Sequence, residues 1–162
     1  MTHVIHPIPP FFDKESTVLI LGSFPSVRSR EQQFFYGHPQ NRFWKVLADV
    51  FNEEAPETIR EKKNLLKKHK IALWDVIRSC DIKGSSDSSI TNVAANDLSV
   101  ILDKADIRRI ILNGRTAEKY YLKYIKPQIR AEAVCLPSTS PANASWSVSR
   151  LVESWGEAIR FS

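Results

Sequence analysis

Four short runs of branched apolar residues, separated by longer amphipathic segments, most constrain the fold of this 162-residue chain. Short runs of this kind are typical of strands that are buried on both faces. Strands that alternate with helices pair in parallel through right-handed crossovers, and the helices cover the sheet. The expected strands are residues 17–21, 71–74, 109–112 and 132–136. We therefore predict an α/β fold, a three-layer α/β/α sandwich with a central, mainly parallel four-stranded sheet.

The segments between these runs carry apolar residues three and four positions apart, which is the helical period. Asn96 is a plausible N-cap for a short helix, and Thr116 can cap another helix, which Pro127 then ends. The Ser-rich stretch 83–89 is expected to be a loop. The other expected helices cover residues 43–52, 57–70, 98–102 and 148–159.

The composition is that of a soluble protein, with 43% hydrophobic and 25% charged residues. No apolar run approaches the ~20 residues needed to cross a bilayer. The N-terminus lacks a basic segment followed by an apolar stretch, so it does not resemble a secretory signal. We expect one domain over residues 1–162, a cytoplasmic monomer with no membrane association.

Cysteine content and charge narrow the possible partners. Cys80 and Cys135 are too few for a disulfide framework, a zinc ribbon or an iron–sulfur site, so both are expected to be plain thiols. The net charge of +5 favours a polyanionic partner. The basic tract 60–70 is expected to be a solvated helix face rather than a DNA clamp. No metal and no organic cofactor is expected.

Polar and glycine residues follow each predicted strand, at the edge where open α/β sheets bind ligands. After the first strand, a glycine and a proline flank two other residues in a rigid turn. Its backbone N–H groups can bind an anionic oxygen or a carbonyl. The residues of this turn are Gly22, Ser23, Phe24, Pro25 and Ser26, with Ser29 a few positions further on.

The segment before the first long helix brings aromatic, imidazole, amide and guanidinium groups together. Such a set suits a pocket that stacks a planar base and reads its edge. Phe43 and Trp44 fit the apolar face of the following helix, and Asn41 can also be the N-cap of that helix. The candidate site residues here are Tyr36, His38, Asn41 and Arg42.

The second and third strands each end in a polar side chain. Asp75 can accept a hydrogen bond from a base N–H, because an ionised carboxylate is only an acceptor. It can equally pair with Arg78 or cap a turn. Asn113 can read a carbonyl and an N–H together, or it can cap the following helix.

The fourth strand leads into a loop of small hydroxyl residues that two prolines stiffen. Its O–H and N–H groups can contact phosphates without steric bulk, and such a loop can press into a DNA helix. The loop residues expected to bind DNA are Pro137, Ser138, Thr139, Ser140, Pro141 and Asn143.

Together these segments resemble the hypoxanthine-directed branch of the uracil-DNA glycosylase superfamily, over residues 17–155. The motifs are GSFPS at 22–26, GHPQNRFW at 37–44, LWDV at 73–76, LNG at 112–114 and LPSTSPAN at 136–143. The resemblance implies a monofunctional DNA glycosylase that flips a deaminated base, most notably hypoxanthine, out of DNA and hydrolyses its bond to deoxyribose. Asn41 then takes the catalytic role, as the residue that orients the attacking water.

The remaining motif residues divide into two expected groups. The base pocket comprises Gly22, Ser23, Phe24, Pro25, Tyr36, His38, Asp75 and Asn113. Contacts with DNA are expected from Ser26, Ser29 and Arg42 and from the loop after the fourth strand, Pro137 to Pro141 and Asn143.

Two positions depart from the other branches of this superfamily. Those branches carry a catalytic Asp or Asn at the place of Phe24, and many carry a His at the place of Leu136. Two alternatives therefore stay open. The chain can be a uracil- or mismatch-directed glycosylase of the same fold, or a catalytically inactive DNA-binding member. An enzyme acting on free nucleotides is disfavoured, because no Walker-type or dinucleotide-type glycine loop is present.

Overall fold

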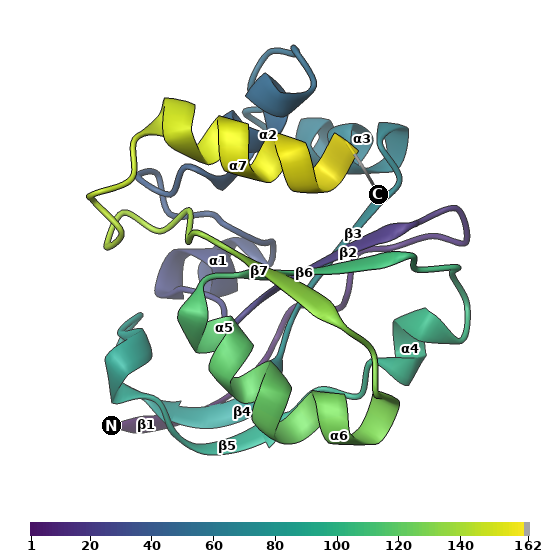
Figure 1. The fold of residues 1–162 in the computed structure, drawn as a ribbon. Helices are drawn as coiled ribbons and strands as arrows, with labels where there is room; N and C mark the ends of the chain where they lie inside the picture. Colours follow the sequence, from purple (N-terminus) through teal and green to yellow (C-terminus); the bar gives the residue numbers. More distant parts are fainter. Residues whose placement is uncertain (161–162) are drawn as a thin grey trace.

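The computed structural model describes residues 1–160, and a four-stranded parallel sheet runs through its centre (Figure 1). The strands lie in the order β3-β2-β6-β7. Their bounds are β2 Val18–Gly22, β3 Ile71–Asp75, β6 Arg109–Asn113 and β7 Ala133–Leu136. These are the four predicted strands with nearly the predicted bounds, so the predicted α/β architecture is confirmed.

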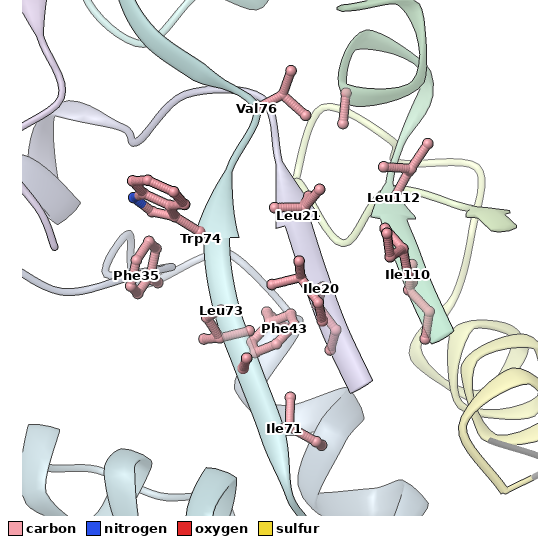
Figure 2. Close-up of a cluster of buried hydrophobic side chains, with 14 of the residues drawn as sticks. Ile20, Leu21, Phe35, Phe43, Ile71, Leu73, Trp74, Val76, Ile110 and Leu112 are labelled. Carbon is pink, nitrogen blue, oxygen red and sulfur yellow. The ribbon is translucent and has the colours of Figure 1, made fainter. Parts of the chain in front are cut away.

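Strands β2 and β3 are buried along their whole length, which explains their unbroken apolar sequences. Ile20 of β2 pairs with Leu73 of β3 on one side and with Ile111 of β6 on the other. Figure 2 shows Phe43 together with Ile20 and Leu73 in the buried cluster around these strands. Phe43 and Trp44 are core residues, as predicted.

Helices cover both faces of this sheet (Figure 1). On one face, α2 and α7 pack together through an edge-to-face contact of Phe43 and Trp155, whose ring centroids are 6.0 Å apart. Helix α3 lies beside α2, and the opposite face carries α5 and α6. The helices are α1 Val27–Gln32, α2 Phe43–Val50, α3 Ile59–Lys68, α4 Ser99–Leu102, α5 Arg115–Tyr120, α6 Lys126–Ile129 and α7 Val148–Arg160.

A second, antiparallel sheet of order β1-β4-β5 was not predicted. It lies below α5 in the view of Figure 1. Its strands are short and partly exposed, so their sequences show no continuous apolar run; in β4 only Ile77, Cys80 and Ile82 are buried. The strands are β1 Thr2–Ile5, β4 Ile77–Ile82 and β5 Thr91–Ala95, with a 3₁₀ turn at Asp87–Ser89 between the last two.

The predicted capping role of Asn96 is wrong. Its side chain is buried, and Nδ2 donates hydrogen bonds to the carbonyls of Asp75 (2.8 Å) and Ile77 (3.2 Å). The acceptor near the start of α4 is instead the Asp97 carboxylate, which takes the N–H of Ser99. Asn96 therefore ties the second sheet to the turn that follows β3.

The helix after β6 also differs from its prediction. It begins at Arg115 with Gly114, not Thr116, in the cap position. Pro127 does not end it, because a π-helical turn over 121–125 leads into α6, which contains Pro127 in its first turn. Proline is tolerated in a first turn, where its missing N–H needs no helical partner. Arg130, in a left-handed conformation, ends the helix.

Both cysteines are free thiols, Cys80 buried and Cys135 half-buried, as expected. Within residues 1–160 no helix is long and apolar enough to span a bilayer. The same part of the chain contains no cluster of three or more His, Cys, Asp or Glu side chains arranged for a metal ion.

We predict that Asn96→Ala destabilises the fold. The substitution leaves the buried carbonyls of Asp75 and Ile77 without their donor, which lowers the free energy of unfolding by about 1–3 kcal/mol. Urea unfolding measures this change. The matched control is Asn64→Ala on the exposed surface of α3, with an expected change below about 0.5 kcal/mol. Equal unfolding midpoints for the two variants would contradict the bridging role of Asn96.

Candidate active site

A cavity of about 990 Å³ opens at the edge where the four parallel strands end. Strand register creates it, since Gly22 pairs with Asp75 and Asn113 pairs with Leu136 at the carboxyl ends of neighbouring strands. Every site residue predicted from the sequence lines this cavity except Arg42. The predicted convergence of the four segments is therefore observed.

Asp75 is held at the floor of the cavity by His6, which follows β1. The distance from His6 Nε2 to Asp75 Oδ2 is 2.7 Å, and both side chains are buried. His6 Nδ1 accepts the N–H of Ile8, so the ring proton lies on Nε2 and His6 donates to the carboxylate. The alternative pairing with Arg78 is wrong. No sequence signal indicated His6, because β1 itself was not predicted.

The approach of Asp75 to Gly22 explains why a glycine ends β2. A Cβ atom on Gly22 would lie 2.5 Å from Asp75 Oδ1 and 3.0 Å from the Tyr36 hydroxyl. Tyr36 stacks on Phe43 with ring centroids 4.0 Å apart. Burial, and next the negative charge of Asp75, raise the pKa of Tyr36 far above its usual range. The phenol is therefore a neutral group at the cavity floor.

Arg42, not the predicted Asn41, occupies the cap position of α2, but the Asn41 side chain still bonds the first turn of this helix and lines the cavity. Its Oδ1 accepts the N–H of Phe43 (2.9 Å), the first residue of α2, and the hydroxyl of Thr139 (2.9 Å). His38 shapes the turn before it: the His38 carbonyl accepts the Asn41 N–H, and His38 Nδ1 accepts the N–H of Gln40.

Asn113 is bound to Thr139 by two hydrogen bonds. Asn113 Nδ2 donates to Thr139 Oγ1 (3.0 Å), and the Thr139 N–H donates to Asn113 Oδ1 (3.1 Å). Asn113 therefore does not cap α5, where Gly114 occupies the cap position. The predicted phosphate contact of the Thr139 side chain is also wrong, because this residue is fully buried and its hydroxyl bonds both amides.

The side chains of Arg42 and Ser29 likewise form hydrogen bonds within the protein and are not placed to contact DNA. The Ser29 side chain is buried, and its Oγ accepts the N–H of Gly37 and the hydroxyl of Ser26. The Arg42 guanidinium donates only to backbone carbonyls of the loop after β7. These carbonyls belong to Thr139, Ser140 (2.8 Å), Asn143 (3.0 Å) and Trp146. The two predicted DNA contacts are thus replaced by hydrogen bonds that stiffen the cavity wall.

Asp87 is a cavity residue that the sequence did not indicate. It comes from the Ser-rich stretch 83–89, which has no motif and connects β4 and β5 of the unpredicted second sheet. Its carboxylate accepts the Ser23 hydroxyl at 3.1 and 3.2 Å. Although the side chain reaches solvent at the rim, its surroundings raise the pKa of Asp87, first by loss of water and next through the charge of Asp75.

Trp146 is a second cavity residue without a sequence signal, because its indole follows the loop motif rather than lying within it. The guanidinium of Arg150 lies 4.0 Å from the centre of its ring, within the range of a cation–π contact. The pair places a broad, positively charged aromatic surface beside the loop 137–143.

A family profile described as the Uracil DNA glycosylase superfamily matches residues 9–158. The chain therefore belongs to the uracil-DNA glycosylase superfamily, and the assignment to the DNA glycosylases that its motifs predicted is confirmed.

Similar proteins agree with this assignment. A protein named hypoxanthine DNA glycosylase from Methanosarcina acetivorans is 37% identical over 156 residues, covering 93% of this chain and 94% of its own. A protein of the same name from Methanosarcina barkeri is 32% identical over 157 residues, with 94% and 96% covered. The solution NMR structure of a candidate uracil DNA glycosylase from M. acetivorans superimposes with a TM-score of 0.82 at 33% identity, covering 98% of each chain.

We predict that Gly22→Ala disturbs the cavity floor while Gly37→Ala is tolerated. In both variants the new Cβ meets an oxygen at 2.5 Å. At Gly22 this oxygen belongs to the buried Asp75, which His6 holds, whereas at Gly37 it ends the exposed, movable side chain of Gln32. We expect a loss of about 1–3 kcal/mol in unfolding free energy for Gly22→Ala, measured in urea. A Gly22→Ala variant as stable as Gly37→Ala and wild type would show that the carboxylate is not rigidly held.

We also predict that Asp87→Asn tightens DNA binding in a pH-dependent way. At neutral pH the wild-type carboxylate repels phosphates at the rim, so the variant binds up to about fivefold more tightly. Because the pKa of Asp87 is raised, the wild type loses this charge as the pH falls, and the gain shrinks toward acidic pH. Fluorescence anisotropy with a short duplex at two pH values measures this.

The control for this measurement is Asp103→Asn, which makes the same charge change on the exposed end of α4, on the opposite side of the molecule from the loop 137–143. Equal tightening by both variants would assign the effect to net charge rather than to the position of Asp87.

Proposed function

We propose that this chain hydrolyses the N-glycosidic bond of hypoxanthine in DNA, acting in the cytoplasm as a monomer. The observation that carries the proposal is the Asn41 amide. It lines the cavity while its Oδ1 is held by two donors, which leaves its Nδ2 group for a water molecule. The names of the two Methanosarcina relatives support hypoxanthine as the base.

The proposed step is a displacement at the sugar. An amide cannot take a proton at neutral pH, so Asn41 orients the water by donating to its oxygen. The water oxygen bonds to the anomeric carbon as the glycosidic bond breaks, and the released proton ends on the departing base. Backbone N–H groups at Ser23 and Phe24 face that base, where the loss of one such donor costs about 3 kcal/mol. Phe24 supplies an apolar wall beside them.

The donors in the cavity favour a base with a carbonyl group. Adenine presents an amino group at C6, and deamination replaces this group with the carbonyl of hypoxanthine. The Nδ2 group of Asn113 lies in the cavity wall, and its N–H that is not used on Thr139 suits such an oxygen. Uracil carries carbonyl groups too, so a uracil-directed enzyme remains the alternative that the experiment below separates.

The loop 137–143 is proposed to meet the DNA backbone as the base flips. Flipping costs a few kcal/mol, and less for a poorly paired deaminated base. The loop tip at Pro141 is exposed, while Arg42 holds the loop from beneath. Ser138 and Ser140 lie on its cavity side and are the proposed phosphate contacts.

A monofunctional reaction fits the chemistry of the cavity wall. A glycosylase with lyase activity forms a covalent adduct through an amine, and among residues 1–160 the wall contains no lysine. We therefore expect no adduct to be trapped by borohydride. The expectation that no metal or organic cofactor takes part stays a prediction.

The test uses labelled duplexes containing hypoxanthine, uracil, xanthine or no damage, followed by cleavage with alkali. We expect wild type to break the hypoxanthine strand and Asn41→Ala to lower the single-turnover rate roughly hundredfold, because the water loses its orientation. Asn64→Ala, on the exposed face of α3, is the control with the wild-type rate. Anisotropy verifies that each variant still binds DNA.

The alternative outcomes are distinct. Breaks with uracil alone would move the chain to another branch of the superfamily. No breaks with DNA still bound would indicate an inactive binding protein. A near-normal rate for Asn41→Ala would remove Asn41 from the mechanism.

A further inference from the structure

We infer that Thr139 is a positioning residue that fixes both cavity amides, Asn41 and Asn113, in the orientation in which each presents an N–H donor to the cavity. The inference rests on the proposed function, because it concerns how the water and the base are oriented. Thr139 itself is fully buried and so acts through these two side chains rather than by contact with DNA.

The orientation of Asn41 follows from its partners. The backbone N–H of Phe43 can only donate, so the amide atom that faces it at 2.9 Å must be the oxygen. Thr139 Oγ1, at 2.9 Å from the same atom, must then donate its proton to it. The Nδ2 group lies on the other side of the amide, so the donor is the free end of the side chain.

The orientation of Asn113 follows in the same way. The backbone N–H of Thr139 faces Asn113 Oδ1, and Asn113 Nδ2 donates to Thr139 Oγ1. Both bonds go to one residue, so they use the amide edge that carries the oxygen and one N–H. The second N–H is directed toward the cavity floor, where the Tyr36 hydroxyl can accept it and the carbonyl of a bound base can compete for it. Asn113 was predicted to bind both a carbonyl and an N–H of the base. Since the amide edge that could do this is bonded to Thr139, Asn113 can offer the base only one N–H donor.

These hydrogen bonds form a chain with one direction, from Asn113 Nδ2 to Thr139 Oγ1 and from there to Asn41 Oδ1. The single proton of the Thr139 hydroxyl is used on Asn41, which leaves its lone pairs for Asn113. Rotating either amide by half a turn would set two donors against each other. With the hydroxyl fully buried, no water can relieve this clash, so the rotated state is costly.

The backbone of Thr139 is held as firmly as its side chain. Its carbonyl accepts the backbone N–H of Arg42 at 3.1 Å and also the Nε of that residue. Arg42, which follows Asn41 in the chain, therefore fixes Thr139, and Thr139 in turn orients the Asn41 side chain. This closed arrangement joins the end of β6, the loop after β7 and the start of α2.

The functional consequence is that the fixed N–H donors of the cavity favour a base that carries a carbonyl group over one that carries an amino group. A carbonyl in the flipped base can accept from Asn113, whereas the amino group of an undamaged adenine would meet a donor. On the other side, Asn41 donates to the water oxygen. Thr139 therefore supports both the choice of a deaminated base and the position of the nucleophile without touching either.

The test compares Thr139→Val, which keeps the shape but removes the hydroxyl, with Thr139→Ser, which keeps the hydroxyl. We expect Thr139→Val to lower the single-turnover rate on a hypoxanthine duplex about tenfold, the effect of one hydrogen bond. The dissociation constant for the same duplex should stay within about twofold of wild type, because that hydroxyl is buried. Thr139→Ser should restore most of the rate.

A double-mutant cycle with Asn41→Ala separates positioning from general disruption. If Thr139 acts through Asn41, adding Thr139→Val to Asn41→Ala lowers the rate little further. A full additional tenfold loss would overturn the inference that Thr139 positions Asn41. So would weakened DNA binding by Thr139→Val, or a rate that Thr139→Ser does not restore.

The cycle also distinguishes this inference from the proposed function. A slow Asn41→Ala together with a normal Thr139→Val would leave the proposed function intact and remove the role of Thr139. A normal rate for Asn41→Ala would remove the proposed role of Asn41, and the positioning role would fall with it. Thermal unfolding of Thr139→Val shows whether the variant is folded, and Thr139→Ser decides the question if it is not.

Discussion

The hydrogen bonds from Arg42 to the loop after β7 hold together the two segments that build the candidate active site. The guanidinium donates to four carbonyls of this loop, and the backbone N–H of Arg42 donates to one of the same four, the Thr139 carbonyl. The next residue, Phe43, anchors the start of α2 in the core beneath. The loop and the start of α2 are therefore fixed relative to the strand ends. The side chains of Thr139 and Asn41, which belong to these two segments, are fixed with them.

Such a fixed cavity suits a reaction that begins with an unfavourable step. Flipping a base costs a few kcal/mol, and a site that must also order its own side chains adds an entropic cost. Here the amides are already oriented, and the His6–Asp75 pair is already buried under Gly22. With a second carboxylate from Asp87 at the rim, the surroundings of the cavity favour positive charge. This matches a sugar that becomes cationic as its bond to the base stretches.

The sequence predicts the parallel sheet well because β2 and β3 are apolar on both faces, and it predicts the cavity because parallel strands bring their carboxyl ends to one edge. His6 and Asp87 escape prediction, since both depend on a second sheet whose strands are too exposed to leave an apolar pattern. The errors at Thr139 and Arg42 have another cause. A hydroxyl or a guanidinium that contacts phosphate has the same residue type as one that bonds a buried carbonyl, and only packing decides between them.

The two departures from other superfamily branches are explained by the same packing. Phe24 is buried with its ring edge-on to His6 at 5.7 Å, and Leu136 is buried at the end of β7. Neither position offers a polar atom from its side chain, so any orientation of water by a side chain must come from elsewhere on the wall. Asn41 is placed to supply it, and it is held by a buried hydrogen-bond chain. Apolar side chains in place of Asn41, Thr139 and Asn113 would stabilise the fold more easily than this buried hydrogen-bond chain does. A protein that only bound DNA would have no use for an amide held in one orientation, which favours an active enzyme.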